Sequence, residues 1–209
     1  MDKPFILYGR PGTGSLAVQI ALEEMGLGYE RVWVGSEPAD VDRFRDINPA
    51  GKVPALRLPD DTVMFESAAI LMHLSLLDAP TKLAPQSGTT RHALFLQSMI
   101  FLSETVYSAA LRLFYSSRYS SRGEADAAAI AERARMEYAT HLESIGRTLS
   151  PYALGADYTL VDPYLYMLAS WSPEKNELFA RVPRLAAHAE KVSSRPAVKK
   201  VEADHAKNA

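Results

Sequence analysis

The residues with the clearest chemical meaning surround Pro54. Residues 48–56 read NPAGKVPAL, so that Val53 and Pro54 stand directly before a short apolar run. Proline fixes φ and lacks a backbone donor, and a Val-Pro bond can be cis at modest energetic cost. A tight turn of this kind can leave the N–H and C=O of Val53 facing outward. An extended, peptide-like ligand can then bind to these groups as an added strand.

A second polar pair, Glu66 and Ser67, lies where the next apolar run ends and a helical pattern begins. The first turn of a helix has free N–H groups and the positive end of the helix dipole. This position therefore suits the charged end of a small ligand. The two pairs together predict a ligand site.

Apolar periodicity predicts the elements that position these residues. Strands are expected at residues 4–8 and 29–34, and a helix at 15–25 between them forms a βαβ unit. The next expected elements are a short helix at 40–47, two hairpin-like strands at 55–58 and 63–65, and a helix at 67–77. The order βαβ-α-ββ-α is that of a thioredoxin-like α/β domain.

The remainder of the chain has helical patterns only. Residues 78–88 contain proline, serine and glycine without periodicity, and we interpret them as a linker. The expected helices are 91–115, 124–149, 158–171, 174–179, 184–192 and 196–201, with a frayed tail after Glu202. We therefore expect an α/β domain at residues 1–77 and an all-α domain at 89–209.

Composition narrows the class of protein. The chain has 209 residues, of which 47% are hydrophobic and 23% charged, with a net charge of -2 and no cysteine. No basic excess favours nucleic acid, and no apolar run has the length of a membrane span. The five histidines have no metal-ligand spacing. We expect a cytoplasmic protein without a metal, without a nucleic-acid partner and without membrane attachment.

The chain resembles the soluble glutathione transferases over nearly its whole length. The resemblance is carried by four motifs in a fixed order, at residues 7–17, 48–56, 66–70 and 159–162. It implies a thioredoxin-like N-terminal domain that binds glutathione and an all-α C-terminal domain that contributes a cleft for the electrophile. It also implies a homodimer that conjugates glutathione, its co-substrate, to small hydrophobic electrophiles in detoxification.

The resemblance assigns a role to each residue of the ligand-holding half. The backbone of Val53, before Pro54, pairs with the cysteinyl part of glutathione, and Glu66 and Ser67 hold its γ-glutamyl end. Glu66 can pair with the ligand's ammonium group, and Ser67 can bond its carboxylate. Lys52 either pairs with the glycyl carboxylate or is a solvated surface lysine.

The half that activates the thiol departs from the pattern. The loop resembles the bacterial beta class most closely, but Gly14 occupies the position of that class's cysteine. Val106 stands where the class tends to place a histidine. Ser15, at the start of the first helix, could donate a hydrogen bond to a thiolate or only cap the helix. Thr13 and Tyr8 are the alternative hydroxyl groups.

The second substrate would meet side chains from the helical domain. Glu104, Tyr107, Tyr115 and Trp171 are candidates for the electrophile cleft, with Tyr8 from the first domain. Aromatic residues at helical spacing also occur in cores, and that alternative stays open. The Thr159-Leu160-Val161-Asp162 motif is capping-box-like, and we assign it a structural role only.

Two other functions are compatible with the sequence. One is a glutathione-dependent isomerase or lyase with a specialised substrate, and the other is a binding or regulatory protein that has lost the chemistry. Gly14 and Val106 are the residues that favour the second alternative.

Overall fold

The structure is a computed structural model that describes residues 3–77, 79 and 82–208. It divides into two compact units. Unit 1 comprises Met1–Ala84 and Ser194–Ala209, and unit 2 comprises Pro85–Ser193. Unit 1 combines a β-sheet with helices, and unit 2 is built from helices, so the predicted fold class is confirmed.

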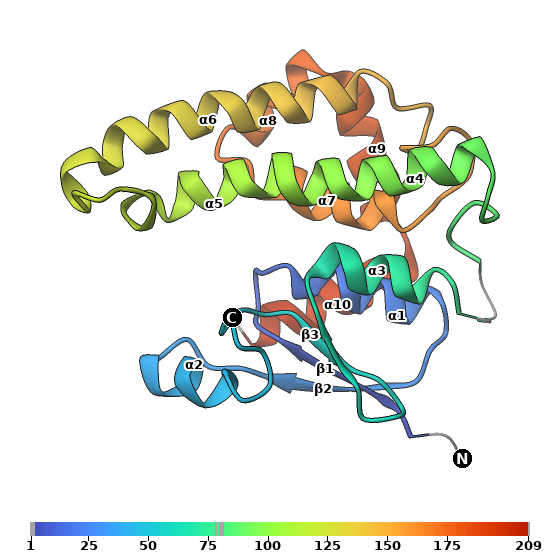
Figure 1. Cartoon of the computed structure of the whole chain (residues 1–209). Helices are drawn as coiled ribbons and strands as arrows, with labels where there is room; N and C mark the ends of the chain where they lie inside the picture. The colour runs from blue at the N-terminus through green and yellow to red at the C-terminus, as the bar shows by residue number, and fades with distance from the viewer. Residues whose placement is uncertain (1–2, 78, 80–81, 209) are drawn as a thin grey trace. The chain divides into compact units, whose positions relative to one another are not determined.

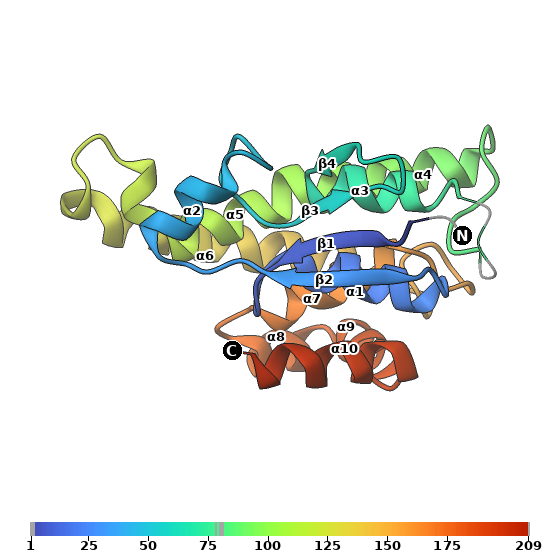
Figure 2. The same cartoon turned by 90° about the horizontal axis from the view of Figure 1, so that it is seen from below.

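A four-stranded mixed sheet forms the centre of unit 1 (Figure 1). Its order is β2-β1-β3-β4, and its strands are β1 (Phe5–Gly9), β2 (Tyr29–Trp33), β3 (Ala55–Arg57) and β4 (Val63–Phe65). β1 and β2 are parallel, as the βαβ pattern predicts, and can be followed side by side in Figure 2. β1 pairs with β3, and β3 with β4, in antiparallel fashion.

Side chains alternate between the two faces of this sheet. Leu7 and Leu56 are opposite each other in register and fully buried. Tyr8 and Ala55 form the next pair and pack with Phe44, the last residue of α2 (Pro38–Phe44). The alternation therefore places buried side chains on both faces of the sheet. The face that carries Tyr8 and Ala55 packs against α2.

The other helices of unit 1 are α1 (Ser15–Glu24), α3 (Ser67–Leu74) and α10 (Pro196–Lys207), and they lie together on one side of the strands in Figure 1. α1 contacts β1, α3 and α10. Every residue of α1 from Ser15 to Leu22 is buried. The enclosure of α1 explains why its sequence is apolar nearly all round.

The last helix differs from the expectation. The sequence predicts a short helix at 196–201 with a frayed tail, but α10 continues to Lys207. Its buried residues Val198, Val201 and His205 recur at helical spacing, and the helix packs on α1. α10 therefore belongs to unit 1, although the boundary 89–209 places it in the helical domain.

Unit 2 is all-helical, as predicted. Its elements are α4 (Thr90–Ile100), η1 (Phe101–Tyr107), α5 (Ser108–Phe114), η2 (Ser116–Tyr119), α6 (Glu124–Gly146), α7 (Val161–Ser170), α8 (Lys175–Arg181) and α9 (Pro183–Ser193). α6 runs beside η1 and α5 (Figure 1). α7 forms the core, because its residues from Val161 to Ala169 are all buried.

The predicted long helix at 91–115 contains a π-helical segment. α4, η1 and α5 are continuous, and η1 has seven π-helical residues in the middle. Among the described residues, Thr90–Phe114 is long and apolar enough to cross a membrane by length and composition, with 33% of its most apolar window buried. Core helices of soluble proteins meet the same criterion, so this finding is weak support for a span.

Asp162 closes the start of α7, as the capping-box pattern predicts. Its Oδ2 accepts hydrogen bonds from Thr159 N at 2.7 Å and from Thr159 Oγ1 at 3.1 Å. Its Oδ1 accepts from Ala153 N at 2.8 Å and lies 2.9 Å from His188 Nε2. The role of His188, which is buried, was not evident from the sequence because it depends on the packing of α9 against α7.

Candidate functional site

The turn before β3 has the geometry that the sequence pattern indicates. The bond between Val53 and Pro54 is cis, Pro54 is buried, and β3 begins at Ala55. The N–H and C=O of Val53 take part in none of the backbone–backbone hydrogen bonds found outside the regular elements of the described chain. The side chain of Lys52 is exposed.

The β3–β4 register brings the two predicted pairs together. Ala55 is opposite Phe65 in this antiparallel pair. One residue further along, Pro54 and Glu66 lie at the same end of the hairpin. Residues separated by about a dozen positions in the sequence therefore become neighbours, as a single extended ligand requires.

Glu66 has an unusual backbone conformation at this point. Its φ is 69° and its ψ is 108°, in the region that favours glycine. Such a conformation costs about 1–3 kcal/mol and tends to occur at functional sites. Glu66 is exposed, while Ser67 is the buried first residue of α3. The strained residue is thus an exposed glutamate that directly precedes a helix N-terminus.

The loop between β1 and α1 directs two hydroxyl groups inward. Ser15 is 0% exposed, and its hydroxyl donates to Arg10 O at 3.0 Å and accepts from Arg10 N at 3.2 Å. Thr13 is partly exposed, and its hydroxyl donates to Arg10 O at 2.7 Å. The two hydroxyl oxygens are 3.0 Å apart. A Cβ on Gly9 would lie 2.8 Å from Ser15, so Ser15 is packed tightly against β1.

Tyr8, the third candidate hydroxyl, lies in the core beneath α2. It is 8% exposed, and its ring centroid is 5.8 Å from that of Phe44. Its hydroxyl accepts hydrogen bonds from Arg57 Nε at 3.3 Å and Nη2 at 3.2 Å. This surrounding gives Tyr8 a packing role on the sheet.

In unit 2 the structure brings together two of the predicted cleft residues. The ring of Tyr107, in η1, is 5.2 Å from the ring of Trp171 in an edge-to-face arrangement. Glu104 is exposed and accepts a hydrogen bond from Ser103 Oγ at 3.0 Å. The guanidinium carbon of Arg118 lies over the ring of Tyr115, 4.3 Å from the centroid of that ring.

π-helical segments are often found at functional sites. The π-helical segment η1 contains Glu104, Val106 and Tyr107. Of these three residues, Val106 is fully buried. The position at which the beta class tends to place a histidine is therefore a core position in this chain.

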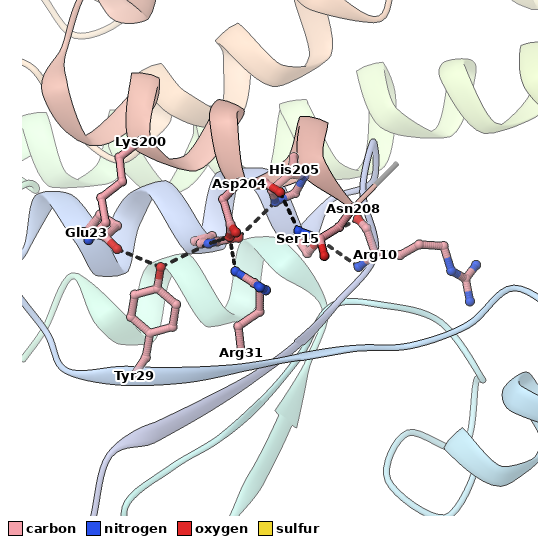
Figure 3. A network of polar contacts seen from close by, with 10 residues as sticks. Arg10, Ser15, Glu23, Tyr29, Arg31, Lys200, Asp204, His205 and Asn208 are labelled. Atoms are coloured by element: carbon pink, nitrogen blue, oxygen red, sulfur yellow. Dashed lines mark hydrogen bonds and ion pairs between the residues drawn. The ribbon is translucent and has the colours of Figure 1, made fainter.

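A polar network that the sequence did not reveal joins α10 to α1 and β2 (Figure 3). Gln19 Nε2 donates to Asp204 Oδ2 at 2.8 Å, and Gln19 Oε1 lies 3.0 Å from His205 Nε2. Asp204 also pairs with Arg31. Burial lowers the pKa of His205 to about 4, and Arg31 acts in the same direction against the opposing effect of Asp204. His205 is therefore neutral near pH 7.

Metal ligands do not gather anywhere in the described part of the chain. No group of three or more His, Cys, Asp or Glu side chains there could hold a metal ion. The sequence has no cysteine.

The fold and the site define a two-unit protein with a thioredoxin-like ligand-binding unit and an all-helical unit. The chain belongs to the glutathione S-transferase family. Residues 15–76 match the pattern of the glutathione S-transferase N-terminal domain, and residues 107–205 match that of the C-terminal domain. The family predicted from the sequence motifs is confirmed.

Individual relatives are similar over almost their whole length. The uncharacterized GST-like protein YncG of Escherichia coli (strain K12) is 31% identical, with 93% of this chain and 95% of that protein covered. A glutathione transferase homologue from Sulfitobacter, solved with bound glutathione, is 30% identical with a TM-score of 0.87, covering 98% and 99%. The beta-class enzyme of Sphingomonas chungbukensis is 25% identical with a TM-score of 0.80, covering 96% and 98%.

Proposed function

We propose that this protein is a glutathione transferase that joins the glutathione thiolate to small hydrophobic electrophiles. The observation that carries the proposal is the juxtaposition, by the β3–β4 register, of the Val53-Pro54 turn and the Glu66-Ser67 pair. The relative from Sulfitobacter, which holds glutathione, supports the identity of the ligand.

Each part of glutathione has a chemically suitable partner in unit 1. The Val53 N–H and C=O would pair with the cysteinyl backbone, as a strand added to β3. Glu66 would pair with the γ-glutamyl ammonium group, and Ser67 at the start of α3 would bind the γ-glutamyl carboxylate. Lys52, which is exposed, would pair with the glycyl carboxylate.

Thiolate formation would depend on the loop before α1. A free thiol has a pKa of about 8.5, and each unit of lowering requires about 1.4 kcal/mol of preference for the thiolate. One hydrogen bond to the charged sulfur and the α1 N-terminus could supply about one to two units. Of the two residues that carry the predicted hydroxyls, Thr13 is the one that is partly exposed, and Ser15 would hold the loop from inside.

The reaction consumes only the two substrates and requires no further reagent. The thiol proton leaves to solvent, the sulfur electron pair forms a bond to the electrophilic carbon, and the leaving group departs with its own electron pair. The protein's contribution would be a larger thiolate fraction and the alignment of two bound substrates. Tyr107 and Trp171 are the residues we propose for contact with the electrophile, with Glu104 and Tyr115 as further candidates.

The direct test combines two measurements on the whole chain. Calorimetry with glutathione should show binding in the micromolar to millimolar range, and a general aryl halide should be converted to its glutathione conjugate. Absence of binding at millimolar glutathione would refute the proposal.

A second function is favoured by the altered loop. Gly14 replaces the beta-class cysteine, and the Ser15 hydroxyl is enclosed. Both observations fit a glutathione-binding or regulatory protein without transferase chemistry. Binding of glutathione without turnover of any electrophile would support that alternative, and turnover of a specialised substrate alone would support an isomerase or lyase.

By analogy with the family we also propose a cytoplasmic homodimer.

A further inference from the structure

We infer that Asn48 is a positioning residue that orients the peptide between Lys52 and Val53 toward glutathione. The inference rests on the proposed function, because it concerns the backbone groups that would bind the ligand.

The side chain of Asn48 closes the turn that precedes Pro54. Asn48 is 2% exposed. Its Nδ2 donates a hydrogen bond to Lys52 O at 2.5 Å, and its Oδ1 accepts one from Ala50 N at 3.1 Å. Its own carbonyl accepts from Gly51 N at 2.7 Å. A buried amide that uses both its donor and its acceptor has little freedom to move.

The same turn is attached to α2. Asn48 N donates to Phe44 O at 2.9 Å, and Arg45 Nη1 donates to Pro49 O at 3.1 Å. Phe44 packs in the core against Tyr8 of β1. The hydrogen bonds of the turn at Asn48 attach it to α2, and the packing of Phe44 attaches α2 to the sheet. The position of the turn is therefore fixed relative to the sheet.

The planarity of the peptide bond gives Asn48 its effect on the ligand-binding group. The Lys52 carbonyl and the Val53 N–H belong to one peptide unit, which is trans. In a planar trans peptide the C=O and the N–H point in opposite directions. Because Asn48 holds the Lys52 oxygen toward the buried side, the Val53 N–H is turned outward. Without the amide donor, rotation of this unit would spread the direction of that N–H.

The test uses two substitutions of Asn48 and a matched control. Asn48→Asp keeps an acceptor for Ala50 N but removes the donor to Lys52 O, and Asn48→Ala removes both without adding charge. Asp60→Ala is the control, since Asp60 Oδ1 accepts from Thr62 N at 2.9 Å in the β3–β4 turn, away from Lys52. Affinity is measured by calorimetry with glutathione and with S-methylglutathione, which has no ionisable thiol.

We expect both Asn48 variants to bind both ligands about 10-fold more weakly, a change of about 1.4 kcal/mol. The Michaelis constant for glutathione should rise while kcat at saturating glutathione changes by less than about threefold. Asp60→Ala should keep its affinity. Melting temperatures of all variants show whether each is folded.

Unchanged affinity in both Asn48 variants, with binding by the wild type, would overturn the inference and leave the proposed function standing. An equal loss in Asp60→Ala would also overturn it, because the effect would then be a general loss of turn structure. Failure of the wild type to bind either ligand would overturn both the inference and the proposed function.

Discussion

The loop between β1 and α1 places two hydroxyl-bearing residues, Thr13 and Ser15, that differ in burial. Ser15 is fully buried between Arg10 and Gly9, whereas Thr13 is partly exposed although its hydroxyl also donates to Arg10 O. A group that stabilises a thiolate must contact the sulfur, so the lower burial of Thr13 favours it over Ser15 for this role. The hydroxyl of Ser15 instead satisfies the Arg10 backbone N–H and C=O, which would otherwise lack this partner.

We predict that Thr13→Val raises the pKa of bound glutathione by about one unit and lowers kcat/KM about 10-fold, because the thiolate loses a hydrogen bond. Thr13→Ser should restore both values. The pKa is measured from the absorbance of the thiolate as pH is varied.

Ser15→Ala should reduce the free energy of unfolding by about 1–3 kcal/mol with little change in thiol pKa. The opposite pattern, a raised thiol pKa in Ser15→Ala only, would return the chemical role to Ser15.

Glu66 combines a strained backbone with the proposed contact to an ammonium group. Glycine adopts its φ of 69° without the Cβ penalty, whereas alanine does not. We predict that Glu66→Gly is more stable than Glu66→Ala by about 1 kcal/mol in urea unfolding. Both variants should bind glutathione at least about 10-fold more weakly. Wild-type affinity in either variant would show that the Glu66 carboxylate does not contact the ligand.

At the scale of elements, α10 is held on α1 and β2 by both apolar and polar contacts. Val198 and Val201 supply apolar burial. Asp204 and His205, both labelled in Figure 3, contact the side chain of Gln19. Because Gln19 lies one turn beyond Ser15, the network supports the N-terminal half of α1, which follows the loop that contains Thr13. Loss of α10 would uncover one side of a helix that is buried from Ser15 to Leu22.

The burial of His205 predicts a pH dependence of stability. Its pKa is lowered to about 4 in the folded state, first by desolvation, and is about 6.5 when unfolded. The unfolded state therefore binds a proton first as pH falls, so stability is complete above about pH 6.5 and decreases toward pH 4. Below about pH 4 both states are protonated and no further loss arises from His205.

We expect this decrease to be smaller in His205→Gln than in the wild type by about 1–3 kcal/mol, measured as the free energy of unfolding in urea at pH 7 and pH 4.5. The difference between the two proteins isolates His205 from Asp204 and other carboxylates. His73→Gln, at a partly exposed position, serves as the control. Parallel pH profiles for His205→Gln and wild type would contradict the assignment.

For the molecule as a whole, the exposed apolar side chains of α4 bear on its assembly. Leu94, Leu96 and Ile100 are each more than a third exposed. Leu96 and Ile100 are four residues apart and share one face of the helix. Together with the dimers of the family, this face supports the proposed homodimer.

We predict a mass in solution of about twice the 23.0 kDa of one chain, measured by light scattering at micromolar concentration. Ile100→Arg should shift this mass toward the monomer, because a charge would enter an apolar contact. Lys175→Ala, on the short helix α8, is a suitable control. A wild-type mass of one chain would contradict the homodimer.

Much of the architecture was predictable from local patterns. Apolar periodicity of two and of 3.6 residues is a property of short segments, so the strands, the helices and their order could be read directly. Pro54 and Glu66-Ser67 were identified for the same reason, since a proline before a strand and a polar pair before a helix are local signals. The capping interaction of Asp162 with Thr159 spans only three residues and was equally accessible.

The remaining features depended on contacts between distant segments. The burial of Ser15, the packing of Tyr8 beneath α2 and the docking of α10 on α1 are consequences of which faces meet, which periodicity does not specify. The fold class and the residue types of the proposed glutathione site could be predicted without these contacts, because both depend on local patterns. Strand register and helix packing, which depend on contacts between distant segments, bring Pro54 to the same end of the hairpin as Glu66, close the turn before Pro54 with the buried Asn48 side chain, and leave Thr13 less buried than Ser15.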